Sequence, residues 1–225
     1  MTFSLVARCS QTGMLGVAIA SSSICVVSRC PWVRSGVGAS TTQNVTDPSL
    51  GNLMLNYLEE GLNVQEAIDK IIENNKFINY RQLSLIDAKG NSASFTGSKI
   101  LGRHAVSKGV DCIATGNLLS STNVINSMTD NFKKNSNVHF IERLLLALQA
   151  GVDSGGEEGP LHSTGIKVAH ENSWPLVDLR IDWTENNPVA ELIELWNTYK
   201  PQMEDYKSRA TNPDKAPSYG VPGDL

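Results

Sequence analysis

The pattern of hydrophobic and polar positions predicts strands from the start of the chain. Over residues 2–8, Phe3 and Leu5 alternate with Thr2 and Ser4, which is the two-residue period of a half-buried strand. The segments that follow are rich in Gly, Ala, Ser and Val, small residues that suit a sheet with both faces closely covered. Further strands are expected at residues 13–23, at 32–43 (one strand or two), in a hairpin over 81–97, and at 110–116, 162–169 and 175–182.

Other segments have the apolar spacing of amphipathic helices. The first starts at Asp47, a capping residue, with Pro48 in the first turn. In the second, Asn63 and Glu66 have the spacing of a capping box. The helices are expected over residues 47–61, 63–74, 122–133 and 137–150, and from Pro188 onward.

The order of these elements predicts the fold class. Strands grouped with strands, and helices paired with helices, favour antiparallel sheets over a repeated βαβ unit. Two helix pairs need two sheet faces to cover, so we expect an α+β fold with four layers, helix, sheet, sheet and helix. One such domain is expected over residues 1–200, followed by an extended tail over 201–225 that contains Pro213, Pro217 and Pro222.

Composition narrows the class of protein. Of 225 residues, 40% are hydrophobic and 19% are charged, which is typical of a globular chain. The net charge of −4, without a basic block, argues against nucleic-acid binding. No apolar run approaches the roughly 20 residues that span a bilayer, and the first residues lack the pattern of a signal peptide. We therefore expect a cytoplasmic protein that binds no membrane and whose four cysteines are free thiols.

Several short motifs together resemble one protein family. They are TFSLVAR, GVAIASSS, CPWVRSGVGASTTQN, the DPSLG helix start, RQLSLIDAKGNSASFTG, Gly116-Asn117, AHENSWPLVDLRID and NPVAELIELW, and they extend from residue 2 to about residue 200. This set is similar to bacterial domain-of-unknown-function family 1028, which is assigned to the N-terminal nucleophile (Ntn) hydrolase-like class. The resemblance implies the αββα fold of proteasome subunits and supplies no substrate.

One loop departs from that family's pattern. Where the family has Gly-Gly-Asp, then Arg-Gly, then Gln-Ser, this chain reads GGEEGPLHS over residues 155–163. If this loop shapes the pocket, we expect a substrate different from that of the relatives.

Thr2 is the centre of the enzymatic interpretation. A Thr hydroxyl needs a base to take its proton, and the α-amine of a chain's first residue, with an ordinary pKa of about 8, can do so. Removal of Met1 before a small residue such as Thr2 would free that amine. Retention of Met1 would leave Thr2 with an amide nitrogen and no base. The alternative is that Thr2 is only a favourable strand residue.

Two charged residues on strands are further catalytic candidates. Arg34 lies in the segment where proteasome-like Ntn hydrolases carry a Lys beside the nucleophile, and its guanidinium would bind a substrate carboxylate. Asp178 shares one strand face with Arg180 and Asp182, a ladder of charges that could orient the nucleophile. The alternative for Arg34 and Asp178 is an exposed strand position.

Polar residues at strand ends are candidates for contacts with substrate. Thr42, Gln43 and Asn44 end a strand of small residues, and the expected sandwich places that end near the chain start. Amide and hydroxyl groups there could bind substrate or donate to an oxyanion. Asn117 has the same catalytic interpretation, and for all four residues the alternative is a turn.

The remaining candidates carry less chemistry. His162 and Ser163 begin a strand beside the divergent loop and are candidates for substrate binding, although a loop His is more often inert. Cys25 and Cys30 offer a rival nucleophile, but neither has an adjacent His or helix N-terminus to lower its pKa. The four His residues lack metal-ligand spacing, and the sequence has no Walker A loop or dinucleotide fingerprint. We therefore expect no metal and no cofactor.

Two classes of function remain open. The first is an Ntn-type amidohydrolase acting on a small metabolite, with a carboxylate-bearing substrate suggested by Arg34. The second is a non-catalytic ligand-binding or assembly protein on the same fold, with Met1 retained. In either case we expect a homo-oligomer, a dimer, because the tail carries Tyr206 and Tyr219 among prolines and suits wrapping around a neighbouring subunit.

Overall fold

The computed structural model describes residues 2–221, so the predicted removal of Met1 lies outside the described residues. The larger of two antiparallel sheets contains β1 (Thr2–Arg8), β2 (Leu15–Ser21), β7 (Ala105–Gly109), β8 (Cys112–Asn117), β9 (Ser163–Ala169) and β10 (Val177–Ile181). Its strand order is β10-β9-β2-β1-β8-β7. β1 is therefore an interior strand, paired with β2 on one side and β8 on the other.

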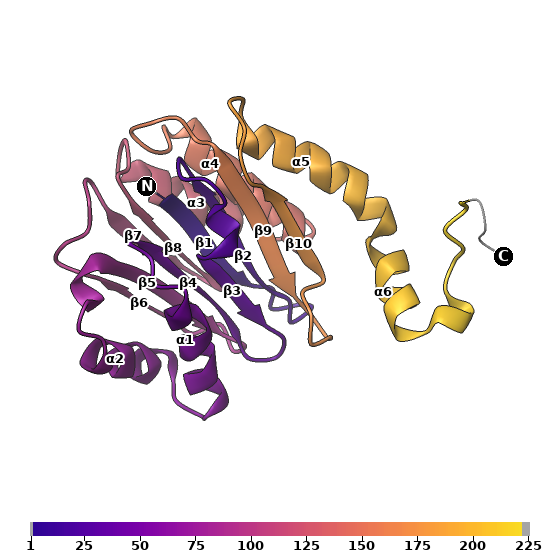
Figure 1. Ribbon diagram of the computed structural model, residues 1–225, viewed down its shortest axis with the longest axis horizontal. Coiled ribbons are helices and arrows are strands. Elements are labelled where there is room, and N and C mark those ends of the chain that lie inside the picture. The colour runs from indigo at the N-terminus through magenta and orange to yellow at the C-terminus, as the bar shows by residue number, and fades with distance from the viewer. Residues whose placement is uncertain (1, 222–225) are drawn as a thin grey trace.

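The smaller sheet lies face to face with the larger one (Figure 1). It contains β3 (Pro31–Arg34), β4 (Gly38–Asn44), β5 (Arg81–Asp87) and β6 (Ser92–Thr96), in that order. β1 contacts both β4 and β5 across the space between the sheets. The segment 32–43 is thus two strands, joined by a turn in which Gly36 has a φ of +69° that favours glycine.

Helices complete the four layers of the predicted α+β sandwich. The α-helices are α1 (Ser49–Glu59), α2 (Val64–Asn74), α3 (Asn123–Lys134), α4 (Phe140–Asp153), α5 (Pro188–Tyr199) and α6 (Met203–Thr211). Short 3-10 helices are η1 (Val26–Ser28), η2 (Ile78–Tyr80), η3 (Lys200–Gln202) and η4 (Pro213–Lys215). α1 and α2 cover the smaller sheet, α3 and α4 cover the larger sheet, and α5 extends that cover over β9 and β10 (Figure 1).

Local sequence signals explain where several helices begin. At the start of α2, Asn63 Oδ1 accepts hydrogen bonds from the backbone of Gln65 and Glu66, while the Glu66 carboxylate accepts from Asn63 N. The predicted capping box is therefore present. Asn187 caps α5 in a similar way, with Pro188 in the first turn.

The layer between the sheets changes from apolar to polar along β1. Because side chains alternate along a strand, Phe3 and Leu5 join the apolar core under α3 and α4, whereas Thr2, Ser4 and Val6 face the smaller sheet. Around Val6 this layer is apolar, with Leu15, Val17, Ile19, Ala39, Ile86 and Ile113. Towards Thr2 it contains buried polar residues, namely Ser4, Ser21, Thr41, Gln43, Gln82, Ser84, Thr115, Asn117 and Ser163. Buried polar groups need hydrogen-bond partners, so this end of the sandwich is held by a polar network instead of apolar contacts.

The structure differs from the sequence prediction in two places. β7 was not predicted, because it is a short edge strand whose residues are mostly half-exposed and carry little apolar pattern. The tail was predicted to be extended, but Met203–Thr211 form α6, with Met203 buried against the core. Asp205 and Arg209 pair at the i, i+4 spacing that supports a helix. Figure 1 shows α6 and the segment after it standing away from the sandwich.

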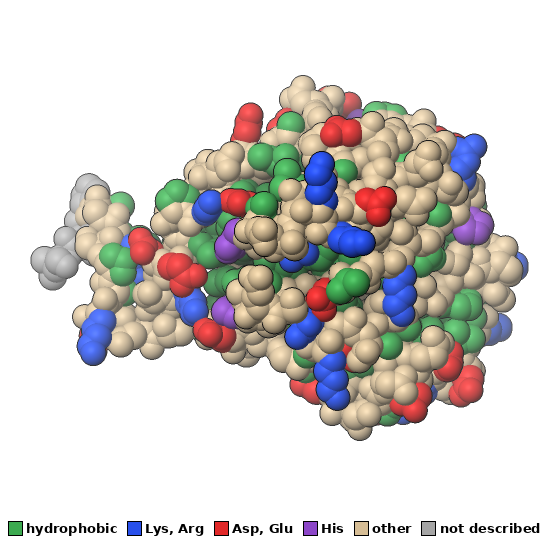
Figure 2. Space-filling model, turned by 180° about the vertical axis from the view of Figure 1, so that it is seen from behind, with side chains coloured by type: hydrophobic (Ala, Val, Ile, Leu, Met, Phe, Trp, Pro, Cys, Tyr) green, Lys and Arg blue, Asp and Glu red, His purple; other side chains and the backbone are tan. Residues whose placement is uncertain are grey.

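The surface carries charges of both signs. Figure 2 shows Lys, Arg, Asp and Glu side chains intermixed over the face opposite to that of Figure 1, without a broad basic area on that face. None of the helices within residues 2–221 combines the length and the apolar character needed to cross a membrane.

Candidate active site

Thr2 lies at the polar end of the layer between the sheets. It opens β1, opposite Asn117 of β8, and only 4% of its surface is exposed. Its hydroxyl oxygen lies 3.3 Å from the hydroxyl oxygen of Ser21, the last residue of β2. The nucleophile candidate is therefore a buried residue of an interior strand, fixed on both sides by its neighbours.

A network of amide side chains joins the two sheets beside Thr2, starting at Ser4 of the same strand. Ser4 Oγ donates to Gln43 Oε1 at 2.9 Å, and Gln43 Nε2 donates to Gln82 Oε1 at 2.8 Å. Asn117 Nδ2 also donates to Gln82 Oε1, at 3.2 Å, and Gln82 Nε2 donates to Gly116 O at 3.1 Å. The structure thus joins Gln43 and Asn117 through Gln82, which the sequence analysis missed.

The side chain of Asn117 has one acceptor atom that is not used within the network. Its Oδ1 is buried and has no hydrogen-bond partner within the part of the chain that the structure describes. A buried unpaired oxygen costs free energy, about 1–3 kcal/mol, unless a water or ligand satisfies it. The side chain is therefore ready to accept a hydrogen bond from a bound molecule.

Ser163 supports the same corner with its side chain, whereas His162 reaches it through its backbone, whose N–H donates to Ser21 O at 3.0 Å. Ser163 Oγ donates to Ser23 O at 2.5 Å and accepts from Val26 N at 3.2 Å, so its hydroxyl holds the chain after β2. The His162 ring stacks on Trp183 with centroids 4.2 Å apart, and its Nδ1 lies 2.8 Å from Thr184 O.

Glu157 is an acidic residue at this corner that the sequence analysis did not select as a site residue. It is 5% exposed, and its Oε2 accepts from Ser22 N at 3.3 Å, next to Ser21. Its Oε1 is buried and finds no hydrogen-bond partner among the described residues. Burial raises the pKa of the Glu157 carboxyl to about 7. The only sequence signal was its place in the divergent loop.

The loop backbone fixes where Glu157 lies. Gly156 N donates to Gly151 O in the last turn of α4, and Gly156 has a φ of +55°, the left-handed region that favours glycine. Ser120 N donates to Gly156 O, and Glu158 N donates to Leu118 O. Glu157 is thus held by backbone bonds on both sides, directly after α4.

A cavity of about 250 Å³ opens beside Glu157. Its walls come from the divergent loop, the end of α4 and the start of α5: Val152, Gly155, Gly156, Glu157, Gly159, Pro160, Leu161, Glu185, Asn186, Asn187 and Pro188. Thr2 is not among them. Glu157 connects the cavity to the surroundings of Thr2, because it lines the cavity and also accepts from the backbone of Ser22, one residue from Ser21.

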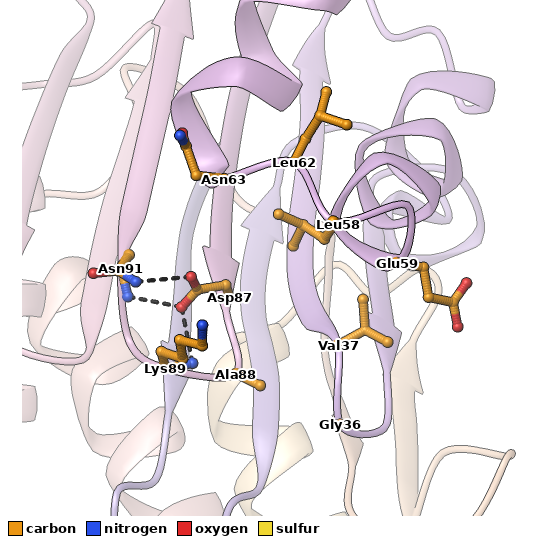
Figure 3. A pocket seen from close by; sticks show the side chains of 11 residues that line it. Gly36, Val37, Leu58, Glu59, Leu62, Asn63, Asp87, Ala88, Lys89 and Asn91 are labelled. Carbon is orange, nitrogen blue, oxygen red and sulfur yellow. Dashed lines mark hydrogen bonds between the residues drawn. The ribbon is translucent and has the colours of Figure 1, made fainter.

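A larger cavity, about 470 Å³, lies elsewhere and carries less chemistry. Figure 3 shows it between the start of α2, the end of α1 and the β5–β6 turn. The carboxylate of Asp87 in its wall accepts hydrogen bonds from the backbone of Lys89 and Asn91 and from the Asn91 side chain, so it serves the turn. We therefore place the candidate site at Thr2 and Glu157.

Arg34 lies far from Thr2, contrary to the expectation from its sequence position. It ends β3 opposite Gly38, and its guanidinium pairs with Glu59 at 2.5 Å and with Asn56 at 2.9 Å on the surface of α1. Gly38 is five residues along β4 from Gln43, or about 16 Å at the rise of a strand. The reason for expecting a carboxylate-bearing substrate therefore does not apply at the Thr2 site.

Asp178 also lies away from Thr2. It pairs with Arg180 through two hydrogen bonds of 2.7 Å on the edge strand β10, which ends at Ile181 before Asp182. Burial raises its pKa, but the Arg180 hydrogen bond and the Lys167 charge outweigh burial and leave the pKa lowered. Lys167 stands opposite Val17, four residues or about 13 Å along β2 from Ser21.

Thr42 and Asn44 flank Gln43 but serve the fold. Alternation turns Thr42 towards the helix side of the smaller sheet, where its hydroxyl is buried without a hydrogen-bond partner in residues 2–221. Asn44 has a φ of +74°, and its side chain bonds Tyr80 O and Leu101 N, which joins β4 to the end of η2 and to the loop before β7.

The cysteine alternative receives no support at Cys30. Burial raises the pKa of its thiol, so the reactive thiolate is disfavoured.

Comparisons with known proteins identify the family. A model of the family of unknown function DUF1028 matches residues 2–192. The crystal structure of protein SPO2555 from Silicibacter pomeroyi, of the same family, has a TM-score of 0.82 and 32% identity over 88% of this chain and 89% of that one. Anbu (ancestral beta-subunit) from Yersinia bercovieri has a TM-score of 0.40 and 11% identity, over 90% of this chain and 96% of that one. Anbu from Hyphomicrobium sp. strain MC1 has a TM-score of 0.39 and 10% identity, over 97% of this chain and 100% of that one. Among curated proteins, none matches. The family model and the similarity to SPO2555 show that the chain belongs to the DUF1028 family.

Proposed function

We propose that this chain is an Ntn-type amidohydrolase that acts on a small molecule, with the Thr2 hydroxyl as nucleophile after removal of Met1. The observation that supports this most directly is the position of Thr2. It begins an interior strand at the polar end of the layer between the sheets, beside Ser21 and opposite Asn117. A strand residue with only a packing role would not need buried polar neighbours on both adjacent strands.

The chemistry uses atoms that Thr2, the substrate and water supply. The freed α-amine takes the hydroxyl proton as Thr2 Oγ1 attacks the amide carbonyl carbon. The tetrahedral intermediate collapses to an ester on Thr2, and the amine product leaves with that proton. Water then attacks the ester by the same route, releasing the acid and restoring the hydroxyl and the amine.

Two neighbours fit the role of stabilising the intermediate. The Ser21 hydroxyl is within hydrogen-bond range of the Thr2 hydroxyl. The Asn117 amide uses one N–H to bind Gln82, which orients the side chain, and its second N–H is the donor assigned to the oxyanion. Polar groups that are held in place before the reaction stabilise a developing charge without reorganisation, and one such donor is commonly worth about 10²–10³ in rate.

The test compares the processed protein with Thr2→Ala and Thr2→Ser variants. Intact mass of protein from its native host establishes whether Met1 is lost, and mass spectrometry follows hydrolysis of a panel of small amides. We expect Thr2→Ala to lose about 10³-fold or more in turnover and Thr2→Ser to keep a measurable part. Equal turnover by Thr2→Ala, or native protein that retains Met1, would contradict the proposal and favour the non-catalytic binding protein.

A further inference from the structure

We propose that the cavity beside Glu157 binds the alkylammonium or alkylguanidinium group of a small cationic ligand. The inference rests on the proposed function only in assigning that group to the substrate of Thr2. It reverses the sign of charge expected from the sequence, where Arg34 suggested a carboxylate.

The first observation is the unused oxygen of Glu157. Glu157 is 95% buried by side chains and backbone, since only 5% of its surface is exposed, and Oε2 is bound by Ser22 N. Oε1 has no hydrogen-bond partner in the described chain, although the residue lines the cavity. A buried carboxylate oxygen without a donor is costly, and a cationic N–H donor placed in the cavity would remove that cost.

The second observation is the charge around the cavity. Glu185 lines it together with Glu157, and none of the described residues in its wall is a Lys, Arg or His. Arg103, in the segment between β6 and β7, is a cation near the divergent loop. It pairs with Glu158 at 3.8 Å and donates to the carbonyl groups of Leu119 and Ser120. The described residues of the cavity wall therefore carry negative charge and no positive charge.

Burial raises the pKa of Glu157 by more than the charge of the chain's amino terminus lowers it. His162 stacks on Trp183, and its Nδ1 lies 3.8 Å from the exposed Glu185 carboxylate. Trp183 Nε1 donates to Glu185 Oε1 at 3.1 Å, which holds Glu185 at the cavity rim.

The start of α5 could have favoured an anion, because helix N-termini carry partial positive charge. Here the Asn187 side chain already accepts hydrogen bonds from Val189 N at 3.0 Å and from Ala190 N at 3.2 Å. The first donors of the helix are thus satisfied within the chain and are not available to a ligand.

The shape of the cavity limits the ligand. Val152, Pro160, Leu161 and Pro188 supply apolar wall that suits a methylene chain, with the Glu157 carboxylate as the charged contact. A volume of about 250 Å³ corresponds to roughly eight water volumes, which fits a chain of a few carbons that ends in an ammonium or guanidinium group.

The test is direct binding of probes that contain no hydrolysable bond. Wild-type protein is titrated calorimetrically with n-butylammonium chloride, sodium butyrate and n-butanol, and so are Glu157→Gln and the matched control Glu158→Gln. Glu158 is the adjacent acid, is about half exposed and does not line the cavity. We expect n-butylammonium alone to bind, with affinity reduced about 30-fold or more in Glu157→Gln and unchanged in Glu158→Gln.

The pH dependence gives a second readout for the same contact. Binding of n-butylammonium should strengthen from about pH 6 to about pH 8 as Glu157 ionises, because the probe stays protonated throughout. Glu157→Gln should remove that change while keeping the circular dichroism spectrum of the wild type. Equal binding of butyrate, or unchanged n-butylammonium affinity in Glu157→Gln, would overturn the proposal.

The outcome separates this inference from the proposed function. Thr2→Ala should bind n-butylammonium as the wild type does, because the probe reacts with nothing. If the probe binds but no amide is hydrolysed, the cationic site is supported and the proposed hydrolase activity is contradicted. If Glu157→Gln stopped hydrolysis but kept probe affinity, Glu157 would serve the α-amine of Thr2, and the cationic site would be wrong.

Discussion

The hydroxyl oxygens of Thr2 and Ser21 lie 3.3 Å apart, so the first residue of β1 is tied by its side chain to the last residue of β2. Ser21 Oγ also accepts from Ser23 N at 3.0 Å, which fixes its position from the other side. This relationship gives the proposed nucleophile a defined orientation.

We expect Ser21→Ala to lower kcat about tenfold with little change in KM, because the Thr2 hydroxyl would lose a neighbour that orients it. Stability should fall by about 1–2 kcal/mol, since Ser23 N loses its acceptor. Steady-state kinetics and urea denaturation measure the two effects. Ser23→Ala is the control, because Ser23 contacts Ser21 and Ser163 through its backbone atoms. Equal kinetics in the two variants would show that Ser21 does not act on Thr2.

Glu157 makes stability depend on pH. Burial raises its folded-state pKa to about 7, above the ordinary value of about 4.3 that applies in the unfolded chain. Between these pH values the folded state holds a proton that the unfolded state has released, so stability falls as pH rises. The total loss is up to about 4 kcal/mol and is complete above about pH 7.

We therefore expect Glu157→Gln to be more stable than the wild type at pH 8 and about equal to it near pH 4. Chemical denaturation across this range measures the difference, with Glu158→Gln as the control. If the difference in stability between Glu157→Gln and wild type did not change with pH, the raised pKa of the Glu157 carboxyl would be wrong.

The amide network should make Gln82 a large contributor to stability. Gln82 Oε1 accepts from both Gln43 and Asn117, and its Nε2 donates to Gly116 O. Gln82→Leu would leave these buried groups unpaired, so we expect a loss of about 3 kcal/mol in urea denaturation. The exposed Gln65→Leu should change stability by less than about 0.5 kcal/mol. A Gln82→Leu variant as stable as the control would mean that water replaces the network.

Thr42 and Thr41 should respond in opposite directions to replacement by Val. The Thr42 hydroxyl is buried without a hydrogen-bond partner in the described chain, so Thr42→Val should be neutral or stabilise by about 1 kcal/mol. The Thr41 hydroxyl lies 2.6 Å from that of Ser84, so Thr41→Val should cost about 1–3 kcal/mol. Thermal denaturation compares the two. A large loss of activity in Thr42→Val would restore Thr42 as a substrate contact.

We expect α6 and the segment after it to contribute to a homodimer. Tyr206 stacks on Tyr199 with centroids 6.0 Å apart, and Arg209 lies over the Tyr219 ring, yet both Tyr206 and Tyr219 remain exposed. Deletion of residues 203–225 should convert a dimer to a monomer in light scattering, whereas Lys215→Ala should not. An unchanged molecular mass after the deletion would contradict this role.

The sequence alone determined the elements whose signals are local. The alternation of Phe3 and Leu5 with Thr2 and Ser4 predicted β1, because side chains alternate between the two faces of a strand. The polar face proved to be buried as well, against the smaller sheet. The capping box of Asn63 and Glu66 sets the start of α2 in the same way. The grouping of strands and helices was enough for the four-layer fold, since each amphipathic face must be covered.

The tertiary structure decided which of these residues meet. Arg34 and Gln43 lie on adjacent strands, yet antiparallel pairing places Arg34 beside Gly38, at the end of β4 remote from Gln43. Gln82 and Glu157 reach the Thr2 corner from β5 and from the loop after α4, and no local pattern marks either as a partner of Ser22 or Asn117. Burial, which raises the pKa of Glu157 and leaves its Oε1 unpaired, is a property of the packed chain, because it depends on side chains more than a hundred residues apart in sequence.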